Sequence, residues 1–551
     1  MATRANAPRR RWAVRATAAL AAVALAELAT CAQATYNVLF ILVDDLKPTL
    51  GAFGDEEAKT PYMDDLLSRG TVFQSMSCSM AICGPSRASL ISGRHADATQ
   101  TWAFQPTFRK VSPELMTLPG HLRQETNHRA VGVGKILDNR NFNTDGELAP
   151  DLCGQDTWEN ADNVHCSWDE YITPKQMRQE PLCNGKTALR WAADDYEDWD
   201  QYDQFEAIIL EIDNVTRHED YCIGLIGREK LVELAANATE QPFFLAVGFV
   251  KPHLPWTGPR ADFESFRTDP DSTILPPPEI QMDLDDNIFW TEQSSSWTKP
   301  SSNAELEKYE GWDTYDASDL VRAYYASTAF VDRQIGALIS TLDNEIDETV
   351  RNNTMIILWG DNGYHLGDFG LWGKKTNLEN SARVPCGIVA PPAWTAISGN
   401  EVQVGAHSDS PTDSVDLYPT VLDILGVDPP SDQTFSGTSL VPIMKNSSAQ
   451  VRAAALSEYV SYENSNFMGY SIRTQSYRLI VYMKLSNKGV FDYSTAKKME
   501  LYHYGEPGAF ETINRIDDDN YADVKAEMLA LIGDPSDPDW THLLGVAPFD
   551  A

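Results

Sequence analysis

The sequence predicts an α/β fold in which helices sandwich a large, mixed but mostly parallel sheet. Four apolar runs rich in β-branched residues indicate buried strands: YNVLFILV from Tyr36, HRAVGVG from His128, PFFLAVGFV from Pro242 and TMIILWG from Thr354. Their hydrophobicity is continuous rather than alternating, which is typical of strands covered on both faces. Helical periodicity lies between them, most clearly in DLVRAYYASTAFVDRQIGALISTLDNEI from Asp319.

The pattern changes after about Ser436. Short alternating runs such as MGYSIRTQSYRLIVYM from Met468 precede a late helical stretch, ADVKAEMLALIG from Ala522. This predicts a small antiparallel sheet with one helix. A chain of 551 residues exceeds what one core usually supports. We therefore expect a large α/β domain at 35–435 and a smaller C-terminal α+β domain at 436–551.

Residues 1–34 have the pattern of a secretory signal peptide. Arginines precede the short apolar run ATAALAAVALA, and an Ala-x-Ala cleavage pattern ends at Ala34. The run is short for a membrane span, so an uncleaved anchor is the weaker alternative. We expect a mature protein of the secretory pathway, lysosomal or extracellular, without stable membrane insertion. Four glycosylation sequons fit that compartment, at Asn214, Asn237, Asn352 and Asn446.

Charge and cysteine content narrow the function further. The formal net charge of −36 argues against nonspecific binding to nucleic acid, and an anionic substrate would need a local basic pocket. Cys31 falls in the signal segment, which leaves an odd number of cysteines: Cys78, Cys83, Cys153, Cys166, Cys183, Cys222 and Cys386. The preferred disulfides are Cys153–Cys166 and Cys183–Cys222, one of three connectivities of these four.

Charged or metal-competent residues follow each predicted strand directly. They are Asp44-Asp45, Lys135, Lys251 with His253, and Asp361-Asn362. Each has an ordinary explanation on its own, as a helix cap, a solvated loop or a turn. In open α/β sheets, however, ligands bind outside the carboxyl ends of the strands. Four polar endings on four strands therefore predict one shared site.

Cys83 lies in the stretch AICGPSRASLISGR, residues 81–94. It could be a nucleophile, a disulfide partner of the nearby Cys78 or a buried thiol. A thiolate phosphatase would place an arginine six positions after the cysteine, where this chain has Ser89. No matched histidine identifies papain-like chemistry.

The stretch CGPSRASLISGR resembles the signature of the formylglycine-dependent sulfatases. In that family a cysteine in a Cys-x-Pro-Ser-Arg context is oxidised during secretion to the aldehyde residue formylglycine. Four more stretches resemble the family in the family's order: NVLFILVDDLKPTLGAFGD, VGVGKI, FFLAVGFVKPHLPW and LWGDNGYHLGDFGLWGKKTN. The resemblance implies an alkaline-phosphatase-like fold, sulfuric ester hydrolysis and a formylglycine-generating enzyme as partner.

The resemblance also implies a metal site. Asp44, Asp45, Asp361 and Asn362, with the modified Cys83, would bind one divalent cation. Carboxylate and amide oxygens suit calcium or magnesium rather than zinc, and we expect Ca²⁺. One hydroxyl of the hydrated aldehyde would attack sulfur, and deprotonation of the other would release sulfate by C–O cleavage.

A basic cradle completes the implied site. By resemblance, Lys374 and His253 bind sulfate and help to protonate the leaving oxygen, while Arg87 and Lys135 hold the hydrated aldehyde, with Lys135 also near the substrate. Asp138 stands where the family usually has a histidine, and we expect it to act as the base in its place. Ser92 replaces a usual threonine.

The substrate is predicted less directly. KPHLPW, the Trp-Gly-Lys-Lys-Thr-Asn spacing and MGYSIRT are most similar to family members that remove 2-O-sulfate from uronic acids of glycosaminoglycans. We therefore expect a sulfated carbohydrate substrate. Trp102, Phe104, Tyr364 and Trp372 could form a sugar-binding rim or belong to the core. A phosphate or phosphonate ester hydrolase and a noncatalytic binding protein with unmodified Cys83 remain as alternatives.

Overall fold

The computed structural model describes residues 36–102, 108–138, 166–177, 183, 209–212, 215–267, 317–368, 371–461, 467–484, 496–505 and 511–532. The expected signal peptide at 1–34 lies outside the described residues. The same holds for Phe104, Cys153 and the sequon at Asn214.

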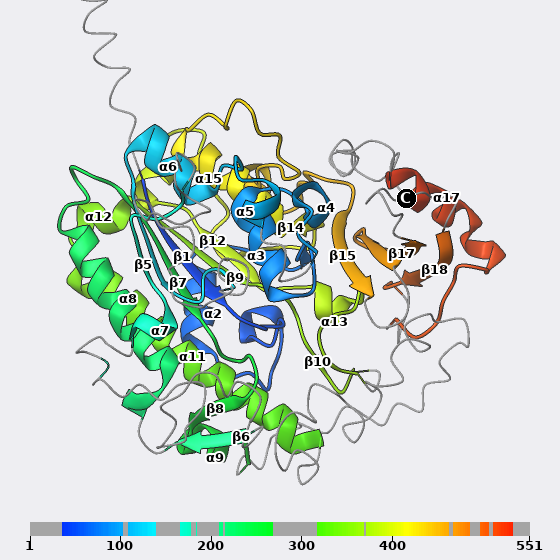
Figure 1. Cartoon of the computed structure of the whole chain (residues 1–551), viewed down its shortest axis with the longest axis horizontal. Coiled ribbons are helices and arrows are strands. Elements are labelled where there is room, and N and C mark those ends of the chain that lie inside the picture. Colours follow the sequence, from blue (N-terminus) through cyan, green and yellow to red (C-terminus); the bar gives the residue numbers. More distant parts are fainter. Residues whose placement is uncertain are drawn as a thin grey trace, which may run out of the picture. The chain divides into compact units, whose positions relative to one another are not determined.

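The four strands predicted from the sequence form the centre of one sheet (Figure 1). They are β1 (Asn37–Val43), β4 (Arg129–Gly134), β7 (Phe243–Phe249) and β9 (Thr354–Gly360). They lie side by side in the order β9-β1-β7-β4, and all are parallel.

Four shorter strands extend this sheet on both sides. They are β2 (Thr71–Phe73), β5 (Glu170–Ile172), β12 (Cys386–Val389) and β13 (Ala406–Ser408). The full order is β13-β2-β12-β9-β1-β7-β4-β5. Because β12 runs antiparallel to both of its neighbours, the sheet is mixed but mostly parallel, as predicted.

The central strands end level with one another. Val43 at the end of β1 pairs with Phe249 of β7 and with Gly360 of β9. Gly134 at the end of β4 pairs with Gly248 of β7. The loops that follow these strands therefore start side by side at one edge of the sheet.

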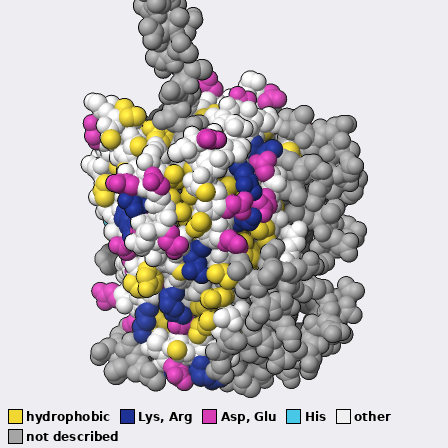
Figure 2. All heavy atoms as spheres, turned by 90° about the vertical axis from the view of Figure 1, so that its left-hand side faces the viewer, with side chains coloured by type: hydrophobic (Ala, Val, Ile, Leu, Met, Phe, Trp, Pro, Cys, Tyr) yellow, Lys and Arg dark blue, Asp and Glu magenta, His cyan; other side chains and the backbone are white. Residues whose placement is uncertain are grey.

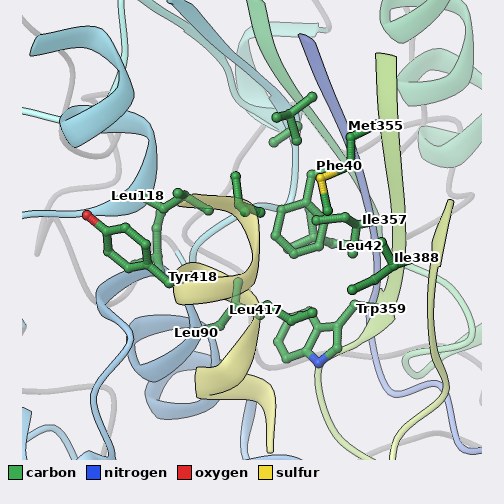
Figure 3. Close-up of a cluster of buried hydrophobic side chains, with 14 of the residues drawn as sticks. Phe40, Leu42, Leu90, Leu118, Met355, Ile357, Trp359, Ile388, Leu417 and Tyr418 are labelled. Carbon is green, nitrogen blue, oxygen red and sulfur yellow. The ribbon is translucent and has the colours of Figure 1, made fainter. Parts of the chain in front are cut away.

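Alternate side chains of the strands enter two separate cores. Phe40 and Leu42 face the helices α3 (Cys83–Ser92), α6 (Leu118–Thr126) and α15 (Leu417–Leu425). Figure 3 shows this core, with Trp359 of β9 beside Leu417. Complete burial of one such side chain contributes about 1.5–3 kcal/mol, so each face of the sheet fixes the helices that cover it.

The opposite face packs on three other helices. Leu39, Ile41 and Val43 of β1 join a core with α2 (Pro61–Ser68), α8 (Glu219–Ala235) and α11 (Ala317–Glu345). The helix predicted from Asp319 is α11. Helices on both faces give the three-layer sandwich that the apolar runs predict.

A four-stranded antiparallel sheet follows toward the carboxyl end. Its strands are β15 (Ala455–Ser461), β16 (Phe467–Arg473), β17 (Tyr477–Lys484) and β18 (Ala496–His503). The late helix, α17 (Ala522–Leu531), contributes Met528 to its core. Met80 and Ile82, just before α3, belong to the same core, so this sheet packs beside the segment that leads into Cys83.

The helix α16 (Val441–Lys445) packs in the core of the large sheet rather than with the small one. The division expected near Ser436 stays a prediction.

Shorter elements connect these layers. The short helices are α4 (Ala96–Thr99), α5 (Phe108–Val111), α7 (Pro174–Met177), α9 (Arg260–Arg267), α12 (Glu348–Asn352), α13 (Glu379–Ala382) and α14 (Pro392–Thr395). Three strand pairs are β3 (Met76–Ser77) with β14 (Thr412–Asp413), β6 (Ile209–Ile212) with β8 (Trp256–Pro259), and β10 (His365–Leu366) with β11 (Trp372–Gly373).

One expected disulfide is confirmed, between Cys183 and Cys222. Cys166 is also disulfide-bonded, while its expected partner lies outside the described residues. Cys78 and Cys83 are both buried free thiols, so a disulfide between them was the wrong alternative.

The described part of the surface in Figure 2 carries charged side chains of both signs, interspersed with one another. Within the described residues, no helix has the length and apolar character needed to cross a membrane. The sequon residues Asn237 and Asn446 are exposed, and Asn352 is half-buried.

Candidate active site

The polar residues after β1 and β9 lie together at the carboxyl end of the sheet. The backbone N–H of Asp45 donates to Asp361 Oδ1 at 2.9 Å. Asn362 Nδ2 donates to Asp45 Oδ1, also at 2.9 Å. These residues and Asp44 are at most 2 % exposed. Because β1 and β9 are neighbours that end level with one another, the residues that follow them form one buried acidic cluster.

This cluster has the geometry of a cation site. Ligand atoms of Asp44, Asp45 and Asp361 all lie within 4.8 Å of one another. A second group within the same distance joins Asp44 to Cys83 and His253. Both groups share Asp44, so one cation could reach carboxylates from both strands and the side chain at position 83.

A buried polar atom supports the same interpretation. Asn362 Oδ1 is buried and has no hydrogen-bond partner among the described residues, while its Nδ2 is held by Asp45 and by the carbonyl of Gly363. An unmatched buried acceptor is costly, which makes a cation a fitting partner. Three carboxylates and an amide oxygen are a hard donor set, so the residues present fit calcium or magnesium.

The carboxylates depend on their cationic neighbours. Burial acts to raise the pKa of Asp44, but Lys135, His253 and Arg87 more than offset it and hold that pKa well below its usual value. Burial raises the pKa of Asp361 to about 7; Arg87 opposes the rise, and the neighbouring carboxylates add to it. Without these cationic neighbours, burial would favour the protonated form of the carboxylates.

Cys83 is the first residue of α3, a helix in which all ten residues are buried. Its Sγ lies 2.9 Å from Lys374 Nζ and 3.8 Å from Asp45 Oδ1. Burial and the charge of Asp44 raise the pKa of the thiol well above its ordinary value, although two lysines oppose them. An unmodified Cys83 is thus a poor thiolate nucleophile in this position.

Lysines from two other loops surround the acidic cluster. Lys374 contacts Asp45 Oδ1 as well as Cys83, and its side chain is 12 % exposed. Lys135 follows β4, contacts Asp44 and is 9 % exposed. Both ammonium groups therefore lie at the border between the buried carboxylates and solvent, where an anionic group can reach them.

His253 lies in the turn after β7. Its Nδ1 is 2.6 Å from the carbonyl of Leu254, which makes Nδ1 the protonated nitrogen and directs Nε2 toward Asp45, 3.9 Å away. Lys251 was also predicted as a site residue because it follows β7 directly. Its side chain points into this turn and donates to the carbonyls of His253 and Pro255. Lys251 thus supports the turn that carries the histidine.

Arg87 and Asp138 lie deeper. The Arg87 guanidinium is fully buried and donates to Asp361 at 2.8 Å and to the backbone carbonyls of Lys135 and Ile136. It therefore joins the acidic cluster to the loop after β4. Asp138 is buried on that loop, with its carboxylate 3.9 Å from Lys135 Nζ.

Ser92 and the aromatic residues have other environments. Ser92 Oγ donates to the carbonyl of Ala88 within α3. Tyr364 and Trp372 are each 2 % exposed in a hydrophobic cluster, so the rim alternative was wrong for these two. Trp102 is half-buried, with Nε1 donating to Asp97. The large apolar rings of Tyr364 and Trp372 favour burial over exposure to solvent.

Sequence reasoning missed the residues that support the site from behind. Ser86 Oγ donates to the carbonyl of Asp361. The hydroxyl of Tyr171 donates to the carbonyl of Gly134, next to Lys135. Tyr324 contacts the backbone after β1 from a helix 279 residues away. Such contacts carry no local motif, so only the tertiary structure reveals them.

A carboxylate cluster flanked by fixed cations at the ends of parallel strands is an arrangement suited to a metal-dependent hydrolase of anionic esters. Residues 36–427 match the family model described as Sulfatase, and residues 367–533 match N-sulphoglucosamine sulphohydrolase, C-terminal. The first match covers most of the chain. The chain therefore belongs to the sulfatase family, whose members hydrolyse sulfate esters, and the resemblance noted from its motifs is confirmed.

Individual relatives agree with this membership. Iduronate 2-sulfatase of Mus musculus is 26 % identical over 422 residues, covering 72 % of this chain and 69 % of the relative. That of Homo sapiens is 24 % identical over 519 residues, covering 85 % and 88 %. The phosphonate monoester hydrolase of Agrobacterium radiobacter has the same fold, with a TM-score of 0.64 at 20 % identity over 90 % of this chain and 94 % of that one.

Proposed function

We propose that this protein is a sulfuric ester hydrolase that removes 2-O-sulfate from a uronic acid of a glycosaminoglycan or related polysaccharide. The observation that carries the proposal is that four strands end level with one another. Asp45 and His253 thereby lie near the side chain of Cys83, and Asp361 and Lys135 lie against the carboxylates beside it. The similarity to iduronate 2-sulfatases supports the substrate class.

Cys83 is proposed to be converted to formylglycine by a formylglycine-generating enzyme in the secretory pathway. The raised pKa of the thiol supports this, because it disfavours direct thiolate attack. The hydrated aldehyde would supply one hydroxyl to attack sulfur and a second whose deprotonation releases sulfate. The final location, lysosomal or extracellular, and glycosylation at the exposed sequons belong to the same proposal.

A divalent cation, proposed to be Ca²⁺, would be held by Asp44, Asp45, Asp361 and Asn362 with residue 83. When bound it would neutralise the carboxylates and polarise the nucleophilic oxygen. Calcium is preferred because its flexible coordination of six to eight oxygens suits a site drawn from several loops.

The basic residues have separate proposed roles. Lys374, which lies 2.9 Å from the Cys83 side chain, and Lys135 would bind the non-bridging sulfate oxygens through fixed charge. His253, in its doubly protonated form, would give the Nε2 proton to the leaving oxygen, while its Nδ1–H stays bonded to a backbone carbonyl. Arg87 would hold the loop of Lys135 and balance Asp361, besides the contact with the hydrated aldehyde that the resemblance implies.

Asp138 is proposed to take the place of the usual family histidine as the base in sulfate release. Its carboxylate would repel sulfate, but Lys135 at 3.9 Å reduces that repulsion. In an Asp138→Asn variant we expect a stoichiometric burst of the alcohol product followed by turnover slowed about 10²-fold. An Asp138→His variant should restore steady turnover. Wild-type turnover in the Asn variant would remove Asp138 from the mechanism.

The test of the activity itself compares substrates. Purified protein from a secretory host would be assayed on a 2-O-sulfated uronate disaccharide, a 6-O-sulfated glucosamine disaccharide, and matched aryl sulfate and aryl phosphate esters. We expect preference for sulfate over phosphate and for the 2-O-sulfated uronate over the other sugar. Preference for the phosphate ester would instead support a phosphonate or phosphate hydrolase, the alternative that the Agrobacterium neighbour favours on fold.

A noncatalytic binding protein is the remaining alternative. It predicts an unmodified Cys83 and no turnover of any of these esters, together with retained binding of the sulfated sugar.

A further inference from the structure

Asp45 is held in an uncommon backbone conformation. Its φ angle is 59°, in the left-handed region that non-glycine residues rarely adopt. Its carboxylate contacts Lys374, lies 3.8 Å from Cys83 Sγ and accepts from Asn362 Nδ2 at 2.9 Å. Since a strained residue persists only where its surroundings hold it, the orientation of this carboxylate needs a support that is not part of the loop itself.

Tyr324 of α11 supplies that support. Its hydroxyl donates to the backbone carbonyl of Asp45 at 2.7 Å and accepts from the backbone N–H of Lys47 at 2.9 Å. The side chain is fully buried. One phenol group thereby bridges both sides of the turn after β1, and a phenylalanine would leave a buried carbonyl and a half-buried N–H without this partner.

The ring of Tyr324 also touches the two neighbouring segments. It stacks on Tyr364 with ring centroids 5.9 Å apart and an interplanar angle of 29°. It meets Trp256 edge-on at 6.3 Å and 81°. Tyr364 lies two residues after Asn362, and Trp256 lies three residues after His253. The same side chain therefore packs under the loops after β1, β7 and β9.

We infer that Tyr324 is a positioning residue that holds Asp45, and through it the carboxylate cluster, in the geometry that binds the cation. This rests on the proposed function for the nature of the ligand. Tyr324 itself touches neither the substrate nor the reacting atoms, so it acts on the chemistry only through the loops that it supports, and its hydroxyl acts through the turn that carries Asp45.

The chain provides a matched control on the same helix. Tyr325, the next residue, is also largely buried, and its hydroxyl donates to Asp55 Oδ2 at 2.6 Å. Asp55 lies ten residues further along the chain than Asp45, and its carboxylate accepts from Tyr325 and from the backbone N–H of Glu57 rather than from the carboxylate cluster. Tyr325→Phe thus removes one phenol hydrogen bond from α11 without altering the support of Asp45.

The experiment compares Tyr324→Phe, Tyr325→Phe and wild type as full-length secreted protein. Calcium affinity is measured by titration calorimetry, and kcat and KM are measured on an aryl sulfate. For Tyr324→Phe we expect calcium affinity to fall about tenfold, as the loss of a buried hydrogen bond at the turn predicts, and kcat to fall more than KM changes. For Tyr325→Phe we expect both to stay within about twofold of wild type.

Hydrogen exchange of the backbone amides of residues 44–50 in calcium-free protein gives a local readout. It depends neither on catalytic activity nor on the free energy of global unfolding. We expect faster exchange there in Tyr324→Phe alone. Equal calcium affinity, kcat and exchange in both variants would overturn the inference while leaving the proposed function intact. A wild type that neither binds calcium nor cleaves the ester would overturn the proposed function and this inference with it.

Discussion

The protein has two largely buried groups of charged residues, one at the strand ends and one beside the C-terminal sheet. They contain similar residue types, but one is suited to binding a ligand and the other to stabilising the fold. The second, called here the C-terminal cluster, consists of Glu379, Arg473, Arg478, Tyr504 and Glu511. Arg478 is fully buried and pairs with Glu379, with Tyr504 at 2.8 Å and with Glu511 at 2.8 Å. Glu511 also accepts the backbone N–H of Glu379. Every charged group in it has a protein partner.

The strand-end cluster is matched less completely. Asn362 Oδ1 is buried and has no hydrogen-bond partner among the described residues. Lys374 and His253 keep 12 % and 21 % of their side chains exposed. A fully paired buried cluster specifies a fold, whereas one with an unmatched acceptor and partly exposed cations is prepared for a ligand. The following predictions test this distinction.

The largest effect is expected on removing the side chain at the centre of the strand-end cluster. Cys83→Ala should lower kcat on an aryl sulfate by about 10⁴-fold or more, because it removes the precursor of the nucleophile. The matched control is Cys386→Ala, which truncates another buried free thiol, in β12. Steady-state kinetics of both variants measure the difference. Activity of Cys83→Ala within about tenfold of wild type would show that residue 83 has no such role.

Breaking the C-terminal cluster should instead affect stability. Arg478→Met leaves the buried Glu511 and the partly buried Glu379 with less compensation, and we expect the free energy of unfolding to fall by about 3–5 kcal/mol. Denaturant unfolding measures it. The counterpart in the strand-end cluster, Lys374→Met, should cost about 10²-fold or more in kcat/KM with a smaller change in stability. Equal stability losses in the two variants would remove the distinction between the clusters.

The C-terminal cluster should also give a pH signature. Burial acts to raise the pKa of Glu379, but Arg473 and Arg478 more than offset it and lower that pKa to about 2. A depressed folded-state pKa contributes stability above the unfolded value, which is lost as pH falls toward the folded value. The loss should run from about pH 4.5 down to about pH 2 and reach roughly 3 kcal/mol.

Unfolding of wild type and Glu379→Gln across that pH range measures this contribution. The Gln variant should have a flatter profile, and identical slopes would assign the acid sensitivity to other groups.

The smallest expected effect is that of removing the cation. Calcium at about one hundred times its dissociation constant should raise the free energy of unfolding by about 2.7 kcal/mol over chelated protein. Thermal melting with calcium and with chelator measures the difference. Asp361→Asn should abolish it, whereas Arg478→Met should retain it despite lower stability. A calcium effect that survives in Asp361→Asn would place the cation elsewhere.

Much of the fold could be predicted because its signals are local. Continuous apolar runs gave β1, β4, β7 and β9, and the rule that ligands bind at the carboxyl ends of parallel strands brought Asp45, Asp361, Lys135 and His253 to one edge. The late alternating runs and α17 were predicted in the same way. The family motifs then supplied Cys83 and Lys374, whose positions lie outside those strand ends.

The remainder depends on contacts between distant segments. Nothing near Tyr324 indicates that its hydroxyl reaches Asp45 across 279 residues. Tyr364 and Trp372 could not be oriented from the sequence, because aromatic side chains occur at sugar-binding rims as well as in cores, although more often in cores. Arg87 shows the same limit, since its motif marks it as functional without revealing that its guanidinium joins Asp361 to the loop of Lys135.

The central claim is that the strand-end cluster is a sulfatase site built around a modified Cys83. It is tested most directly by the mass spectrum of the peptide that contains residue 83, from protein made in a secretory host that has a formylglycine-generating enzyme. We predict that the thiol is replaced by an aldehyde in the active protein, and that the aldehyde is absent from the Cys83→Ala control. An unmodified thiol throughout, in protein that still cleaves sulfate esters, would contradict the account.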